Sequence, residues 1–177
     1  MTNVDIPERL AARPFDARRR LPIPYVSEHD DGSVNFATVN GARVLQCARE
    51  RRCSLCGQPD DYWLAFVGGL GGFHLRAYTD PPGHVDCMRA ALALCPYLTL
   101  ERHRRRGLSQ TTAAPGFTDM EKAGPVILAV TRDYTTSLLG EPGGVPALLF
   151  HPAPWKSATR YAYRGGHLTE SGPEPLR

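Results

Sequence analysis

The spacing of hydrophobic and polar positions divides the chain into short helices and strands. Residues 40–52 place apolar side chains at helical spacing with arginines on the other side, which predicts a short amphipathic helix. A second helix is expected in the Ala- and Leu-rich run that follows Asp86, and Pro96 ends it. Before both, residues 1–35 contain several prolines and a polar cluster, which predict an extended, irregular arm that wraps the domain.

Strand-like runs lie between and after these helices. Residues 62–67 and 73–78 flank the glycine-rich sequence GGLGG, and this arrangement predicts a β-hairpin. Three later runs are rich in β-branched and aromatic residues and are separated by Gly/Pro-rich turns: GPVILAVTRDY, PALLFHP and ATRYAYRGG. They predict an antiparallel sheet. The residues from His167 onward are expected to fray.

Length and composition indicate one α+β domain. The chain has 177 residues, of which 42% are hydrophobic and 22% charged, as in an ordinary globular domain. Its 17 Gly and 16 Pro predict many loops and few long helices, which suits a domain stabilised by a metal. The expected parts are the arm (1–35), a core that contains all five cysteines (40–100), a basic and polar loop (101–122), a β-rich part (123–166) and a tail (167–177).

The sequence contains neither a membrane span nor a secretory signal by pattern. No run approaches the roughly 20 consecutive apolar residues of a spanning helix, and the N-terminus is charged where a signal peptide is apolar. We therefore expect a cytoplasmic protein with no membrane partner. In a reducing compartment a CxxC pair indicates metal binding or redox chemistry, and the odd count of 5 cysteines argues against complete pairing.

Four residues carry the clearest chemical signal. Cys53 and Cys56 bracket a tight turn closed by Gly57, while His84 and Cys87 are three apart on the first turn of the second predicted helix. Four nitrogen and sulfur ligands complete a tetrahedral shell and leave no position for a substrate water, so the expected cofactor is a structural Zn²⁺ ion. The turn that carries Cys53 and Cys56, here called the knuckle, is followed by the predicted hairpin and then by the helix. This order is that of a treble-clef zinc finger, joined here to a C-terminal antiparallel sheet.

The other readings of these cysteines are weaker. A redox pair requires a cysteine of low pKa at a helix N-terminus, whereas helix-like sequence precedes Cys53. Cys47 and Cys95 fall on apolar or semi-apolar sides of the predicted helices, and we interpret them as small buried hydrophobic residues, with Cys95 the better spare ligand.

Several segments occur in an order that resembles a known family. They are LPIPYV, CSLCGQP, AFVGG, DPPGHVDCMRAALALCPYL and VTRDY. In this order, between Pro7 and Tyr163, they resemble a family of uncharacterised bacterial and phage-encoded proteins with a CxxCG, PPxHxxC and CPFL pattern, although CPYL stands here in place of CPFL. The resemblance implies a stand-alone domain and no particular activity. The family's signature positions fall here on Cys53, Cys56, His84, Cys87 and the Cys95–Pro96 pair.

Charge suggests what such a domain contacts. The net charge of +3 and the pI near 8.7 permit nucleic-acid binding. Two arginine clusters are candidate phosphate-binding groups: Arg49, Arg51, Arg52, Arg102, Arg104, Arg105 and Arg106. The second cluster lacks interleaved aromatic residues, so we prefer to interpret it as a solvated loop, with a phosphate-binding patch as the alternative. We expect a non-enzymatic module that binds nucleic acid or another protein; the sequence does not indicate its oligomeric state.

Two further functions are considered. An HNH-type nuclease needs a histidine base near the end of the first strand and a metal-binding histidine on the helix, but His74 lies in the second predicted strand and His84 is assigned to zinc. A small-molecule-binding or modifying protein would use aromatic residues to line a pocket: Tyr62, Trp63, Trp155, Tyr161 and Tyr163. We prefer to place these aromatic residues in the core of the sheet.

Overall fold

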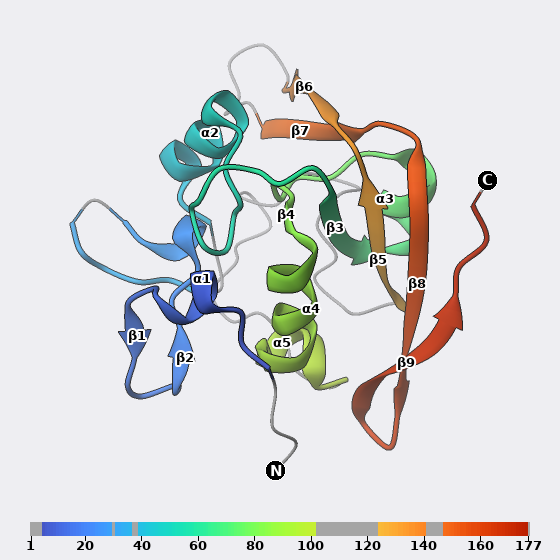
Figure 1. The fold of residues 1–177 in the computed structure, drawn as a ribbon, viewed down its shortest axis with the longest axis horizontal. Coiled ribbons are helices and arrows are strands. Elements are labelled where there is room, and N and C mark those ends of the chain that lie inside the picture. Colours follow the sequence, from blue (N-terminus) through green and yellow to red (C-terminus); the bar gives the residue numbers. More distant parts are fainter. Residues whose placement is uncertain (1–4, 30, 37–38, 102–123, 141–146, 177) are drawn as a thin grey trace.

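The computed structural model describes residues 5–29, 31–36, 39–101, 124–140 and 147–176 (Figure 1). In chain order the elements are α1 Glu8–Ala11, β1 Phe15–Asp16, β2 Leu21–Pro22, the 3-10 helix η1 Tyr25–Ser27, α2 Gly41–Glu50, β3 Leu64–Gly69, α3 Leu70–Leu75, β4 Gly83–His84, α4 Val85–Leu94, α5 Pro96–Thr99, β5 Val126–Thr131, β6 Tyr134–Leu139, β7 Ala147–Pro152, β8 Trp155–Arg164 and β9 His167–Pro173. The predicted α+β class is confirmed.

An antiparallel sheet with the strand order β4-β3-β5-β8-β9 forms the centre of the fold (Figure 1). Its middle strand, β5, is buried along its whole length, because helices cover both of its faces. Val126, Leu128 and Val130 pack toward α4, whereas Ile127 and Ala129 pack toward α3. Strands β5, β8 and β9 therefore continue the same sheet as β3 and β4, which lead to the second pair of predicted ligands. The predicted strand PALLFHP forms β7, which pairs with β6 in a separate two-stranded sheet and not with β5 or β8.

A further buried cluster joins α2 and the β6–β7 hairpin to this sheet. Phe66 of β3 packs against Tyr78 and Tyr134, with ring centroids 4.8 and 6.2 Å apart. Phe150 of β7 is fully buried, and its backbone exchanges two hydrogen bonds with Tyr78, of 3.0 and 2.8 Å. Val44 and Cys47 bring α2 to the same cluster. The helix that precedes the cysteine knuckle is thus anchored in the main core.

Both predicted helices are confirmed. Asn40 caps α2, because its side chain accepts a hydrogen bond of 2.9 Å from the backbone N–H of Ala42. Arg51 ends α2 in the left-handed conformation, with φ 52°. Helix α4 ends at Leu94, and Pro96 begins α5. Among the described helices, none combines the length and the apolar composition that crossing a membrane requires.

The predicted hairpin around GGLGG is wrong. The chain leaves β3 and enters α3, and β3 pairs instead with β4 and β5. The tertiary reason is Phe73, which is buried as a helical residue and stacks on Trp155, with ring centroids 5.6 Å apart. Gly68 and Gly72 leave room for the Tyr78 ring, since a Cβ at Gly68 would lie 2.8 Å from it. These glycines therefore serve packing and not a turn between strands.

The ends of the chain are more ordered than predicted. The arm contains the short helix α1 and the β1–β2 hairpin, so it is not wholly irregular. The tail does not fray at His167, because β9 pairs with β8 through a two-residue turn at Gly165 and Gly166, with φ 57° and 82°. Beyond this strand Glu174 is buried, and its carboxylate accepts a hydrogen bond of 2.9 Å from Arg160.

Candidate metal centre

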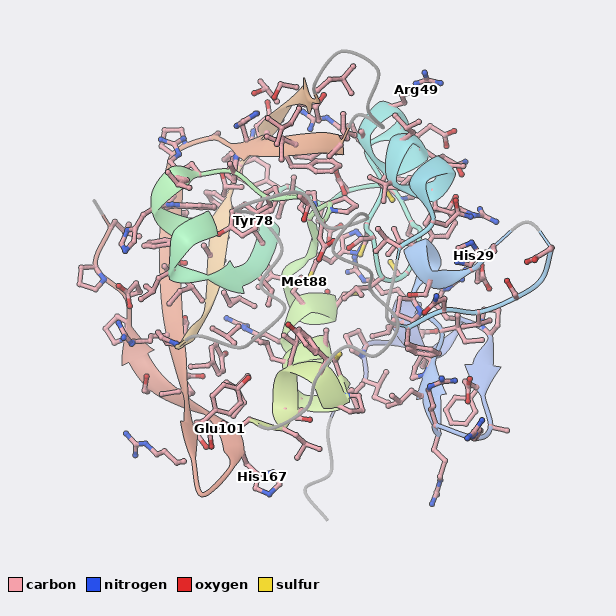
Figure 2. All side chains as sticks on the ribbon, turned by 180° about the vertical axis from the view of Figure 1, so that it is seen from behind. His29, Arg49, Tyr78, Met88, Glu101 and His167 are labelled. Carbon is pink, nitrogen blue, oxygen red and sulfur yellow. The ribbon has the colours of Figure 1, made fainter. Side chains whose placement is uncertain are left out.

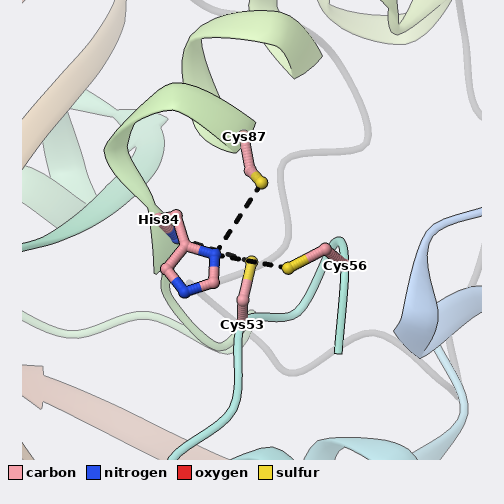
Figure 3. Close-up of side chains that lie close together, drawn as sticks. All are labelled: Cys53, Cys56, His84 and Cys87. Carbon is pink, nitrogen blue, oxygen red and sulfur yellow. Dashed lines mark hydrogen bonds between the residues drawn. The ribbon is translucent and has the colours of Figure 1, made fainter. Parts of the chain in front are cut away.

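The first two candidate ligands lie in the turn that follows α2. The backbone N–H of Gly57 donates to the carbonyl of Cys53, and the N–H of Cys53 donates to the carbonyl of Gln58, both at 2.9 Å. Gly57 has φ +76°, a conformation that glycine adopts without strain. These contacts bend the chain so that Cys53 and Cys56 point to the same side (Figure 3).

The other two candidate ligands stand where β4 becomes α4. His84 is the last residue of β4 and pairs with Leu64 of β3. Cys87 follows on the first turn of α4, on the same side as the imidazole of His84. The sheet therefore fixes the position of His84, and the helix fixes its spacing to Cys87.

The four side chains converge in a buried cluster (Figure 3). One ligand atom from each residue lies within 4.8 Å of all the others. The Nδ1 atom of His84 lies 3.3 Å from the Cys56 sulfur and 3.8 Å from the Cys87 sulfur. These distances bracket the separation of about 3.5 Å that follows from tetrahedral zinc with bonds of about 2.3 Å to sulfur and about 2.0 Å to nitrogen. The cluster can therefore hold a metal ion.

Hydrogen bonds orient the histidine for this task. Its Nε2 lies 2.8 Å from the carbonyl of Pro59, which can only accept, so Nε2 carries the proton and Nδ1 keeps its lone pair for the metal. The backbone N–H of His84 also donates to the Cys53 sulfur at 3.4 Å. Such contacts stabilise negative charge on a thiolate.

Because the three thiols lie close together, their pKa values differ. Hydrogen bonds from Cys53 and then Cys87 lower the pKa of Cys56, whereas hydrogen bonds to Cys53 and Cys56 raise the pKa of Cys87. The cluster therefore loses its first proton readily and its later ones reluctantly. A bound cation reverses the second effect, because metal binding displaces the thiol protons.

Gly83 lets the strand approach the cluster. A Cβ atom there would lie 2.8 Å from the Cys53 sulfur and 3.0 Å from the end of Met88. The first contact is shorter than real side chains show, and the sulfur cannot move away without leaving the cluster. Gly83 is therefore part of the site, and the prolines before it, Pro81 and Pro82, are fully buried.

The N-terminal arm covers the outer side of the centre. Arg9 of α1 pairs with Asp61 at 2.7 Å and with Asp86 at 3.4 Å, and so connects the loop after the knuckle to the start of α4. An open pocket of about 580 Å³ lies beside these three residues. None of the five aromatic residues predicted to line a pocket borders it.

Those aromatic residues do not surround one cavity, although the rings of Tyr62 and Trp63 touch, with centroids 5.0 Å apart. Trp155 packs in the core against Phe73, and the Tyr163 hydroxyl donates to the carbonyl of Leu98 at 2.9 Å. Tyr62 is 65% exposed and carries the Arg132 guanidinium over its ring. The five side chains therefore do not line a common pocket.

In the first arginine cluster, which consists of Arg49, Arg51 and Arg52, two members form ion pairs within the chain. Arg51 pairs with Asp133, and Arg52 pairs with Glu50 at 2.6 Å and donates to the carbonyl of Gly57 at 2.8 Å. Arg49 is exposed and projects from the end of α2 (Figure 2). The second cluster, Arg102, Arg104, Arg105 and Arg106, lies outside the described residues.

The nuclease constellation does not assemble around the expected histidines. His74 is exposed on α3, and His84 belongs to the cysteine cluster. Within the part of the chain that the structure describes, Cys53, Cys56, His84 and Cys87 form the one group of His, Cys, Asp and Glu residues with the geometry for a metal ion.

Comparison with protein-family models, with curated proteins and with solved structures finds no match to this chain. The family resemblance drawn from the sequence therefore stays a prediction. Sequence reasoning found the four clustered residues but missed Gly83, Pro59 and Arg9. The PPGH sequence was a usable signal for Gly83, because a glycine directly before a ligand often marks a close backbone approach.

We predict that alkylation at pH 8 will separate the five cysteines of the native protein into two groups. Cys47 is fully buried, and burial raises its pKa to about 12. Its thiolate fraction at pH 8 is therefore roughly a thousandfold below that of a cysteine with the usual pKa of about 8.5. Cys95 is half-buried. Mass spectrometry after brief iodoacetamide treatment should show modification at Cys95 and protection of Cys47 and of the clustered cysteines.

Denaturation with a chelator is the control for this experiment, because it should make all five cysteines react. Modification of Cys47 before Cys95 in the native protein would contradict the prediction.

Proposed function

We propose that this protein is a structural zinc protein of the treble-clef type that serves as a non-enzymatic binding module. The observation that carries the proposal is the cluster itself: four converging nitrogen and sulfur ligands, all buried. Such a donor set suits Zn²⁺, and a site filled by four protein ligands has no open position for a substrate. The ion would hold the fold together.

The order of elements around the cluster supports the treble-clef assignment. The knuckle supplies Cys53 and Cys56, β3 and β4 pair as a short hairpin, and α4 follows with Cys87 on its first turn. Helix α3 is inserted between the two strands. Zinc in this position would connect the end of α2 to the start of α4, which no disulfide does among the described residues.

We predict that the purified protein contains one zinc ion per chain. Elemental mass spectrometry measures the ion, and a thiol assay before and after chelation measures the ligands. Chelation should expose three additional reactive thiols, because the ligands must be thiolates to bind zinc. Cys95→Ser, which changes a cysteine outside the cluster, is the control and should keep its zinc.

Metal-free protein with a disulfide between Cys53 and Cys56 would contradict the proposal and favour a redox function. Cleavage of DNA by the zinc-loaded protein, lost on mutation of His74, would favour the nuclease alternative.

A further inference from the structure

The turn of the β1–β2 hairpin displays three consecutive arginines. Arg18, Arg19 and Arg20 follow Asp16 and Ala17, and all three are exposed. The hairpin projects at the edge of the molecule beside α1, away from the central sheet (Figure 1). Phe15, on the first strand of the hairpin, is 60% exposed. A projecting ribbon that carries three cations and an exposed ring contributes little to the core.

Asp16 fixes the shape of this turn. Its carboxylate accepts hydrogen bonds from the backbone N–H of Arg19 at 2.7 Å and from the Arg19 guanidinium at 2.9 Å. Its backbone carbonyl accepts the N–H of Arg20 at 2.7 Å. The backbone bond from Arg19 and the bond from its side chain lower the pKa of Asp16, so this support persists well below neutral pH.

The base of the hairpin is equally well fixed. The N–H of Ile23 donates to the carbonyl of Pro14 at 2.7 Å, and the Arg13 guanidinium donates to the carbonyl of Ile23 at 3.1 Å. Arg13 also pairs with Glu28 at 2.6 Å. The arginines are therefore held on an ordered support, which lowers the entropic cost of binding through them.

Two of the three arginines keep their charge available for a partner. Arg19 is paired with Asp16 and lies over the Phe36 ring at 4.7 Å. Arg18 and Arg20 have no acidic partner within the described part of the chain. Arg20 moreover holds φ +58°, a conformation in which glycine or asparagine is far more common.

We propose that the β1–β2 hairpin is a binding element for duplex DNA, with Arg18 and Arg20 contacting backbone phosphates. A guanidinium matches phosphate geometry, and duplex DNA presents the dense row of anions that such a cluster fits. A two-stranded β-ribbon also fits the major groove, which is about 12 Å wide. This inference rests on the proposed binding function and names its partner.

The test uses the double substitution Arg18→Ser and Arg20→Asn in the full-length protein. Asparagine tolerates the left-handed conformation at position 20, and Asp16 and Arg19 stay in place, so the turn should keep its shape. Fluorescence anisotropy with a labelled short duplex measures affinity between about 50 and about 200 mM salt. The control is Arg89→Ala with Arg164→Ala, which removes the same charge from exposed positions outside the hairpin.

The hairpin variant should bind about tenfold more weakly at low salt, with a log–log salt slope flatter by about 1.8 for two lost phosphate contacts. The control pair should stay within about twofold of the unchanged protein. Absence of duplex binding by the unchanged protein, or equal losses in both double variants, overturns the proposal. Equal or tighter binding to vesicles of anionic phospholipid also overturns it. Zinc content and melting temperature, measured on each sample, report separately on the proposed zinc function.

Discussion

Cys87→Ser should leave the protein without a cooperative unfolding transition. Serine does not supply the thiolate that completes the cluster, and structural zinc contributes on the order of 10 kcal/mol of binding free energy that is also folding free energy. The free energy of unfolding of a whole domain is only about 5–15 kcal/mol, so loss of the zinc would remove most of it. Circular dichroism during thermal unfolding, with metal analysis of the same sample, measures the effect.

The matched control for this substitution is Cys95→Ser. Cys95 is half-buried at the end of α4 and lies outside the cluster. Its replacement should change the unfolding free energy by about 1 kcal/mol or less, as is usual for substitutions outside the core. A folded, metal-free Cys87→Ser protein would refute the structural role proposed for zinc.

Gly57→Ala should lower the free energy of unfolding by about 2–5 kcal/mol. A Cβ there would lie 2.6 Å from the Tyr25 ring, which adds an overpacking cost of about 1–3 kcal/mol to a cost of about 1–2 kcal/mol for alanine at φ +76°. Tyr25 cannot easily yield, because its hydroxyl contacts Gln46 and Arg43. Denaturant titration measures the loss, and a lower zinc affinity should accompany it because Gly57 closes the knuckle.

Gly32→Ala separates the two contributions to this effect. Gly32 has φ +78°, nearly the same as Gly57, but a Cβ there would meet nothing within 4 Å. Gly32→Ala should therefore lower the free energy of unfolding only by the conformational cost of about 1–2 kcal/mol. Equal losses in the two variants would show that contact with Tyr25 is unimportant.

The Cys87→Ser and Gly57→Ala experiments probe the same junction. The N–H groups of Tyr25 and Val26 donate to the carbonyls of Leu55 and Ser54, at 2.9 and 3.1 Å, so the arm is bonded to the knuckle itself. The N–H of Ser54 donates in turn to the carbonyl of Pro82 at 3.0 Å. The arm, the knuckle and the segment before His84 thus form one bonded unit. Loss of the metal should therefore loosen the arm as well as the cluster.

Local patterns were sufficient for the helices and for the clustered residues. The spacing of Cys53 and Cys56 within one turn, and of His84 and Cys87 across the start of α4, is a property of short chain segments. The capping residue Asn40 and the helix-ending Pro96 act over the same short range. For this reason the sequence alone determined which residues meet, the two helices beside them, and the strand character of β5.

Only the tertiary structure decided the features that depend on distant partners. The GGLGG segment becomes helical because Phe73 finds Trp155 of β8, and the tail is ordered because β8 offers β9 a free edge. Arg51 forms an ion pair because the fold brings Asp133, which follows β5, close to it. Such contacts join residues far apart in the chain, and their energies outweigh the weak local preferences of glycine-rich and polar segments.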